Sequence, residues 1–336
     1  MEYPKFKVCC RCFTFNQSKY ITDAMNGFTM QQTSFPFVCT IVDDASTDGE
    51  QDVIRKYVED NFDFTEDSVS YHKETDYAHF TYAQHKTNKN CYFAVLYLKE
   101  NHYSQRKPKM GYLSEWRDMC EYEALCEGDD YWICAQKLQK QVTYLDEHRE
   151  VAYTCHRYNI LTQSLHSIRL QPDIYFDKYK EATLYEFDND YVFNVEWVSK
   201  TLTCVFRIKY FDPIFLRKFE YGRDVHMVYN ILQHGKGICF ADVMGVYRLN
   251  EESTFGGLAP RKRMETSYAV YKELWEETHD KLFLKKTIET HGYKMYAFGI
   301  ELPHNIYQFC AFFDFAKRKL NGLCNHIKRI RNGKTE

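Results

Sequence analysis

Several sequence signatures of common enzyme classes are missing from this 336-residue chain. No G-x-G-x-x-G follows the first apolar run, and no G-x-x-x-x-G-K-[ST] loop is present, which disfavours a dinucleotide-binding or P-loop protein. The chain has no G-x-S-x-G, the turn that carries the serine nucleophile of many hydrolases. Its 13 histidines form no H-E-x-x-H zinc pattern. These absences exclude the enzyme classes that are simplest to recognise from sequence.

Membrane and disulfide signals are also missing. No apolar run reaches the roughly 18 residues that a membrane span needs. The opening residues 1–5 are polar and do not resemble a secretion signal. The 13 cysteines are odd in number and lack the paired spacing of zinc ligands, and the C-x-x-C at Cys9–Cys12 lies inside an apolar run. We therefore expect a cytoplasmic protein with reduced, buried thiols.

Length and charge set further limits. A chain of this length forms one large domain with an appendage, or two domains. The formal net charge is -3, which gives no reason to expect a nucleic-acid partner. The 28 tyrosines and 25 phenylalanines suit a large core and a cleft with aromatic walls.

Apolar runs alternate with helical patterns from the start of the chain. Residues 6–12 and 37–42 are near-continuous apolar runs, as expected of parallel strands covered on both faces. The segment between them has apolar residues at helical spacing, and so does the segment after the second run. Residues 60–90 are predicted to form an insertion, with a hairpin as one option. The alternation predicts an α/β fold with a doubly wound, mostly parallel sheet.

Two pairs of aspartates follow apolar runs at predicted strand ends. Asp43 and Asp44 follow the second run, and Asp129 and Asp130 lie within Glu127–Trp132, after a short apolar run. Ligands of open α/β sheets bind outside the carboxyl ends of strands. Adjacent carboxylates there suit a hard divalent cation that also contacts phosphate oxygens. The alternative is a solvated acidic turn that caps the next helix, and the repetition of the pattern favours the functional interpretation.

A nucleotide-sugar site would use these acids in different ways. Asp44 could accept a hydrogen bond from a base or ribose, or could simply support the following turn. Asp130 could bind the metal and Asp129 the ribose or metal, so that the cation neutralises the departing diphosphate. Asp224 could take the acceptor's proton, although capping a helix is the commoner role for an isolated aspartate. We expect Trp132, next to the acids, to lie in the cleft.

The motifs together resemble those of family 2 glycosyltransferases with the GT-A fold. Residues 8–21 are similar to the family's opening strand, and residues 41–49 to its second-strand motif. Residues 125–132 resemble the D-x-D-type metal motif, in the variant common in bacterial capsule and surface-polysaccharide transferases. Residues 201–207 and 245–248 also fit that subgroup. The resemblance covers about the first 250 residues.

The resemblance implies an inverting transferase that acts on a nucleotide-activated sugar and uses Mn²⁺ or Mg²⁺. It assigns Asp44 to the nucleoside, and Asp129 and Asp130 to the ribose, diphosphate and metal. It also places Phe13, at the end of the opening strand, at the nucleotide. Arg248 is a candidate diphosphate contact, with a structural ion pair as the alternative.

The same resemblance assigns the general base to Asp224, with Glu220 as the fallback. Two departures from the family pattern lie near these positions. Many relatives carry a tryptophan soon after the base, where this chain has Val225-His226, and many carry a histidine where it has Asn250. The second departure puts a metal or diphosphate contact from that loop in doubt.

These observations lead to one predicted function and two alternatives. We predict a GT-A catalytic domain over residues 1–250 and a C-terminal helical region over residues 251–336. The enzyme would move a sugar, with UDP as the expected carrier, to a saccharide or lipid-linked acceptor in surface polysaccharide or glycolipid synthesis. The alternatives are a sugar nucleotidyltransferase and a catalytically inactive GT-A-like binding module.

The C-terminal region carries one further signal. Apolar residues recur at three-to-four spacing between Phe312 and Ile330, with lysines and arginines interleaved. This pattern fits either an interfacial helix on the inner face of an anionic membrane or a helix packed on the catalytic domain. We therefore expect a cytoplasmic protein for which peripheral membrane contact is one option.

Overall fold

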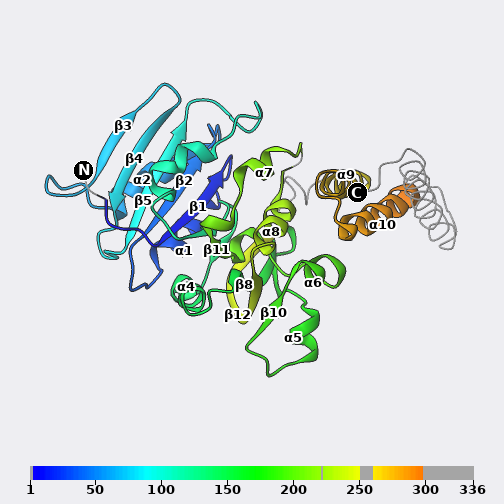
Figure 1. Cartoon of the computed structure of the whole chain (residues 1–336). Helices are drawn as coiled ribbons and strands as arrows, with labels where there is room; N and C mark the ends of the chain where they lie inside the picture. Colours follow the sequence, from blue (N-terminus) through cyan, green and yellow to red (C-terminus); the bar gives the residue numbers. More distant parts are fainter. Residues whose placement is uncertain (1–2, 221, 250–259, 298–336) are drawn as a thin grey trace, which may run out of the picture. The chain divides into compact units, whose positions relative to one another are not determined.

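The structure is a computed structural model that describes residues 3–220, 222–249 and 260–297. The chain divides into two compact units, Met1–Ser253 and Thr254–Glu336, and each is described by itself (Figure 1). The candidate site residues named above all belong to the first unit.

One mixed sheet runs through the first unit. Its strands follow the order β10-β12-β8-β11-β6-β1-β2-β5-β4-β3, with β7 paired to β12 and β9 to β8. The strands are β1 (Val8–Thr14), β2 (Phe37–Asp43), β3 (Tyr71–Glu74), β4 (Ala78–Gln84), β5 (Cys91–Leu98), β6 (Tyr122–Leu125), β7 (Tyr131–Trp132), β8 (Val151–Thr162), β9 (Ser167–Leu170), β10 (Leu184–Phe187), β11 (Val205–Arg207) and β12 (Lys236–Leu249).

The centre of this sheet, β6-β1-β2-β5, is parallel, while antiparallel strands flank it. Nearly every residue of β2 and β5 is buried, which explains why their sequences are continuous apolar runs. In the registers of β1 with its neighbours, Thr14 lies beside Asp43 and Arg11 beside Leu125. The residues that follow β1, β2 and β6 therefore emerge at one edge of the sheet. The α/β fold class predicted from the sequence is confirmed.

Helices and short turns cover both faces of the sheet. The helices of the first unit are α1 (Ile21–Thr29), α2 (Glu50–Asn61), α3 (Ser114–Arg117), α4 (Lys137–Glu147), α5 (Ile174–Lys178), α6 (Asn189–Asn194), α7 (Pro213–Arg217) and α8 (Asp224–Leu232). Helices α1 and α2 bury their apolar faces with the inward residues of β1, β2 and β5, in one continuous core. On the opposite face, α3 and the 3-10 turn η1 (Met110–Leu113) close a second core, which includes Trp116.

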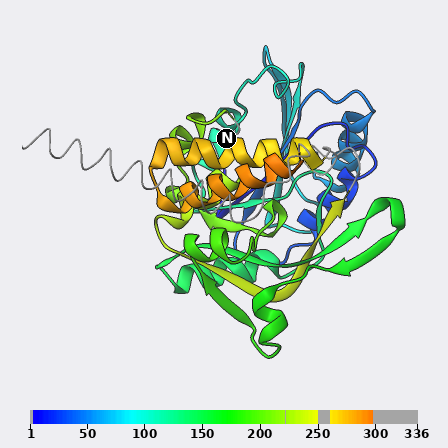
Figure 2. The same cartoon turned by 90° about the vertical axis from the view of Figure 1, so that its right-hand side faces the viewer.

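Some local predictions are confirmed and others are wrong. The insertion does contain a hairpin, β3–β4, which pairs with β5. Residues 201–207, whose apolar run predicts one strand, form the 3-10 turn η3 (Thr201–Thr203) followed by the short β11. Residues 238–240 and 243–247 belong to one long strand, β12, with register shifts between them. Figure 2 shows β8 continuing into the green hairpin with β9 beyond the body of the sheet.

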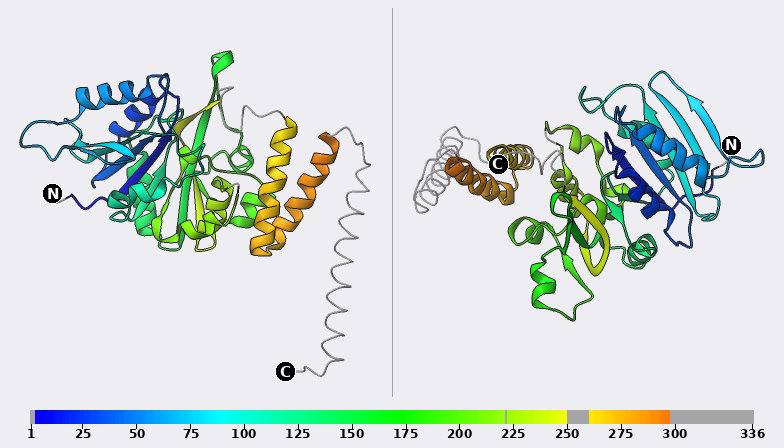
Figure 3. Two further views of the ribbon diagram at one scale, coloured as in Figure 1. Left: turned by 90° about the horizontal axis from the view of Figure 1, so that it is seen from above. Right: turned by 180° about the vertical axis from the view of Figure 1, so that it is seen from behind.

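The second unit contains a pair of helices. They are α9 (Pro260–Thr278) and α10 (Lys281–Ala297), which pack side by side (Figure 3). The backbone reverses at His279, whose φ of 54° lies in the left-handed region. No described helix is long and apolar enough to cross a membrane. The stripe from Phe312 to Ile330 lies outside the described residues.

A buried lysine in the first unit leads to a stability prediction. Lys137, at the start of α4, is fully buried, and its Nζ lies 4.2 Å from the centre of the Trp132 ring. Within the described chain its Nζ has no hydrogen-bond partner. Burial lowers the pKa of Lys137 from 10.5 to about 8. Because the unfolded chain holds this proton more tightly, the free energy of unfolding should rise as pH increases from about 8 to 10.5.

Replacing Lys137 with methionine should therefore stabilise the protein at pH 7. Methionine keeps the packing on Trp132 and removes the buried charge, so we expect a gain on the order of 1–3 kcal/mol in urea unfolding. The rise in stability above pH 8 should also disappear. Lys140→Met is the matched control, because Lys140 on the same helix is half-exposed and pairs with Asp242. A less stable Lys137→Met variant would show that the contact with Trp132 outweighs the cost of burial.

Candidate active site

The acidic motif turns sharply after β6 because Gly128 packs against the loop that follows β1. A Cβ at Gly128 would overlap the side chains of Thr14 and Gln17. This close approach brings the residues after β6 up to the end of β1, with the Gly128 N–H donating to the carbonyl of Phe13 at 3.3 Å. The glycine is therefore a geometric requirement of the motif.

Asp130 is held in place by the far end of β12. Its Oδ1 accepts the backbone N–H of Arg248 at 2.8 Å, and the side chain is only 2% exposed. The pKa of Asp130 is raised well above its ordinary range by burial, and further by the charges of Asp129 and Glu127. Buried negative charge of this kind is what a cation would neutralise.

Arg248 joins several parts of the site. Its Nη1 donates to the carbonyl of Asp129 at 2.7 Å, and its Nη2 pairs with Asp23 of α1 at 2.7 Å. The guanidinium lies between the rings of Tyr20 and Tyr131, at 4.6 and 4.9 Å. The structural ion pair, which was the alternative for this residue, is present. A diphosphate contact stays a prediction, and Nε is the one guanidinium nitrogen with no partner among the described residues.

The donor set fits Mn²⁺ or Mg²⁺. Asp129 and Asp130 offer carboxylate oxygens, the ligands that these hard cations prefer. Within the described ranges no group of three or more His, Cys, Asp or Glu side chains forms a complete metal site. Diphosphate oxygens and water would therefore have to supply the remaining ligands, as is usual for Mg²⁺ at phosphate sites.

Asp44 lies beside the loop that follows β5. Its Oδ1 accepts the N–H of His102 at 2.8 Å, and its Oδ2 accepts the N–H of Tyr103 at 3.0 Å and Lys109 Nζ at 2.6 Å. A carboxylate offers about four lone-pair positions, so these contacts leave one unused, and Asp44 is 1% exposed in this structure. The Lys109 Nζ also lies 5.0 Å from the ring centre of Phe13. The structure thus brings Asp44 and Phe13 together, with a lysine between them that the sequence analysis did not single out.

The structure places Asp224 at a helix N-terminus. It is the first residue of α8, and its Oδ1 accepts the N–H of Val225 at 2.9 Å. Burial, together with the charges of Asp130, Asp129 and Asp224, raises the pKa of Tyr247 to about 12. The charges of all three carboxylates therefore act on one phenol. The fallback residue Glu220 is exposed and lies 3.6 Å from Arg106 of the loop after β5.

His226, at the family's tryptophan position, and Trp132, beside the acids, both have structural roles. His226 is buried, and its Nδ1 accepts the N–H of Arg223 at 3.1 Å, so it helps to begin α8. Burial and the charge of Arg223 lower the pKa of His226 to about 4. The prediction that Trp132 lies in the cleft is wrong. Its ring is 2% exposed in the core, and its indole N–H donates to the carbonyl of Leu202 at 2.8 Å.

Comparison with known proteins supports the fold. No family model matches the chain. A segment of 153 residues, 44% of this chain, is 31% identical to uncharacterized proteins of Mycobacterium tuberculosis and Mycobacterium bovis. The match spans 34% of those relatives, so the chain covers about a third of their length.

Two solved structures share the architecture. TarS of S. aureus, residues 1–349 in complex with UDP-GlcNAc, matches with a TM-score of 0.52 at 17% identity, over 92% of this chain and 80% of that one. The mannosyltransferase PcManGT of Pyrobaculum calidifontis, in complex with GDP-Man and Mn²⁺, matches with a TM-score of 0.51 at 12% identity, over 96% and 81%. The chain has the GT-A fold of these proteins.

Proposed function

We propose that this protein is an inverting glycosyltransferase that moves a sugar from a nucleoside diphosphate, with UDP as the expected nucleotide, to an acceptor hydroxyl. The observation that carries the proposal is the position of Asp129 and Asp130, both bonded to Arg248, at the sheet edge where Asp44 also lies. One acidic pair would hold the metal and diphosphate, and a separate acid would remain for the acceptor. Synthesis of a surface polysaccharide or glycolipid is the proposed setting.

The residues have distinct proposed roles. Asp44 would orient the nucleoside together with Phe13, and Asp129 and Asp130 would hold the metal that neutralises the diphosphate. Asp224 would accept the proton of the acceptor hydroxyl. Residues 1–250 would form the catalytic domain, and residues 251–336 a helical region, for which the two options remain membrane contact through the stripe between Phe312 and Ile330 and packing on the catalytic domain.

The sugar nucleotidyltransferase alternative fits less well. Such an enzyme would need the backbone N–H groups after β1 to cradle phosphate. In this structure acidic side chains already occupy those donors. The N–H of Gln17 donates to Glu50 at 2.9 Å, and the N–H of Ser18 donates to Asp48 at 2.9 Å. Two carboxylates at this loop repel an anionic ligand.

A panel of nucleotide sugars tested by thermal shift with Mn²⁺ tests the proposal. A ligand bound only by the folded state at 100 times its Kd should stabilise the protein by about 2.7 kcal/mol. We expect a UDP-sugar to raise Tm in the presence of Mn²⁺, and the effect to shrink with EDTA. If no nucleotide sugar raises Tm, a binding module with another ligand is the better interpretation. Formation of a nucleotide sugar from nucleoside triphosphate and sugar phosphate would favour the nucleotidyltransferase.

The nucleoside role of Asp44 has its own test. Asp44→Ala removes a charged hydrogen-bond acceptor, which typically contributes 1.5–3 kcal/mol, so UDP affinity measured by calorimetry should fall about tenfold or more. Lys109→Met is the comparison variant, because it breaks the ion pair with the loop and leaves the carboxylate. A smaller loss in Lys109→Met would indicate direct contact between Asp44 and the nucleoside. Unchanged affinity in Asp44→Ala would leave Asp44 with the structural role of holding the loop.

A further inference from the structure

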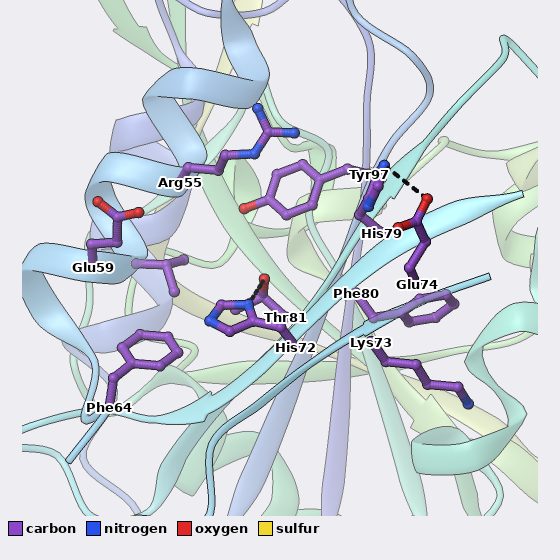
Figure 4. A pocket seen from close by; sticks show the side chains of 11 residues that line it. Arg55, Glu59, Phe64, His72, Lys73, Glu74, His79, Phe80, Thr81 and Tyr97 are labelled. Atoms are coloured by element: carbon purple, nitrogen blue, oxygen red, sulfur yellow. Dashed lines mark hydrogen bonds and ion pairs between the residues drawn. The ribbon is translucent and has the colours of Figure 1, made fainter. Parts of the chain in front are cut away.

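A cavity lies away from the acidic motif, between α2 and the β3–β4 hairpin. Its volume is about 440 Å³, within the usual range for small-molecule sites. Figure 4 shows side chains from both elements and from β5 around it. The residues used below are Arg55, Glu59, Phe64, His72, Lys73 and Tyr97.

The hydroxyl of Tyr97 points into this cavity. The residue is 2% exposed, and its Oη has no hydrogen-bond partner within the described chain. In Figure 4 the hydroxyl projects into the space between α2 and His72. Leaving a buried hydroxyl unsatisfied is costly, and phenylalanine would fill the same volume. A donor that the fold does not use is therefore available to a ligand.

The charges around the cavity are balanced. Arg55 and Glu59 extend from α2, while Lys73 and Glu74 come from β3. An anion entering the cavity would approach the two glutamates, and a cation would approach Arg55 and Lys73. The glutamates would repel an anion, and Arg55 and Lys73 would repel a cation. A neutral molecule that both donates and accepts hydrogen bonds is repelled by neither set of charges. This balance favours a ligand with many hydroxyl groups over a charged ligand.

Flat rings form the walls. The rings of Phe64 and His72 stack nearly parallel, with centres 5.3 Å apart and planes 5° apart, and His72 Nδ1 is bonded to Thr81 at 3.0 Å. The guanidinium of Arg55 lies 4.7 Å from the ring centre of Tyr97. Aromatic surface beside hydrogen-bonding groups accommodates a sugar ring, which has apolar C–H faces and a polar rim.

The cavity and Asp44 lie on opposite faces of the sheet. Tyr97 is the register partner of Asp43, so their side chains share a face, and the carboxylate of Asp43 is bonded to Gln51 of α2. The carboxylate of Asp44 is bonded instead to the loop that carries His102. A ligand bound against Tyr97 is therefore separated from the candidate nucleoside position by the sheet.

We propose that this cavity is a second binding site, for a neutral saccharide, in which the Tyr97 hydroxyl and the side chains of Arg55 and Glu59 bind sugar hydroxyls. If the protein is a glycosyltransferase as proposed above, the site would hold a distant sugar of the acceptor chain, and this last step rests on that proposed function. Binding of a saccharide in this cavity does not depend on the proposed transferase activity.

Binding of methyl glycosides, measured by saturation-transfer NMR with UDP and Mn²⁺ present to occupy the donor site, tests the proposal. The probes are methyl glucoside, galactoside, mannoside and N-acetylglucosaminide, with benzoate and tetramethylammonium as charged comparisons. We expect at least one glycoside to bind wild type and to bind Tyr97→Phe about fivefold more weakly, as the loss of one hydrogen bond predicts. Tm of the free Tyr97→Phe protein should stay the same or rise.

Tyr82→Phe is the matched control, because the Tyr82 hydroxyl is also buried and without a partner in the described residues, but does not line the cavity. This variant should bind glycosides like wild type. Absence of glycoside binding to wild type, equal binding to Tyr97→Phe, or preference for a charged probe would each overturn the saccharide site. Glycoside binding without any nucleotide-sugar binding would refute the glycosyltransferase and leave this site standing.

Discussion

Replacing Asp130 with asparagine is expected to lower Mn²⁺-dependent sugar transfer by roughly 10³-fold or more, because the metal's charge stabilisation is worth several kcal/mol. Asparagine keeps an oxygen that can accept the N–H of Arg248, so the fold should survive. Burial raises the pKa of the Asp130 carboxyl, which shows that the fold disfavours its ionised form. Asparagine cannot ionise, so the metal-free variant should be at least as stable as wild type. The shift in Tm caused by Mn²⁺ should shrink. Transfer or donor hydrolysis and the Tm shift are the two measurements.

Asp242→Asn is the control for this change. Asp242 is a half-exposed carboxylate that pairs with Lys140, so the same substitution there should leave transfer unchanged. Undiminished turnover in Asp130→Asn, combined with insensitivity to EDTA, would remove the metal from the mechanism. A strong loss of stability without metal would instead assign Asp130 mainly to holding β12.

Asp224→Asn is expected to lower kcat by ~10²–10⁴-fold, the usual contribution of a general base. In an inverting transfer the acceptor oxygen approaches the sugar opposite the leaving diphosphate, and a carboxylate on that face takes its proton. Asp224 is the first residue of α8. Donor affinity should stay near wild type, since the substitution leaves Asp129 and Asp130 in place. Steady-state kinetics together with UDP calorimetry separates the two effects.

Glu220→Gln is the comparison for Asp224. Glu220 is exposed and lies near Arg106, whereas the charge of Asp224 acts on Tyr247, as do the charges of Asp129 and Asp130. We therefore expect Glu220→Gln to keep its rate. If it loses its rate while Asp224→Asn keeps it, the base lies four residues earlier in the chain. If both variants keep their rates, another residue takes the proton.

The parts of the site that the sequence predicted are those fixed by local pattern. Asp44 and Asp129–Asp130 follow buried strands whose apolar runs show where the strand ends, and strand ends are where such acids can gather. The inward residues of α1 follow directly from helical spacing: Ile21, Ala24, Met25 and Phe28 are all buried.

The parts that the sequence did not predict depend on contacts between distant segments. Lys109 lies in an irregular loop, and only the folded structure brings it to Asp44, 65 residues away. Trp132 was placed in the cleft because it follows the acids, but the strand pairing of β7 with β12 turns it into the core. The hydrophobic pattern could predict neither the contact of Lys109 with Asp44 nor the burial of Trp132. Irregular polar loops and two-residue strands are too short to show a helical or strand period.

The hydrogen bond between Asp130 and the backbone of Arg248 also has a consequence for synthesis of the protein. The backbone N–H that fixes this carboxylate belongs to Arg248, 118 residues later in the chain. A ribosome synthesises the parallel strands β1, β2, β5 and β6 well before β12, so the emerging chain presents Asp129 and Asp130 with neither the amide nor the guanidinium of Arg248 to hold them. We therefore expect nucleotide binding to appear late in synthesis, only after residue 248 has left the exit tunnel. Stalled nascent chains that end before and after that point would differ in whether they retain UDP.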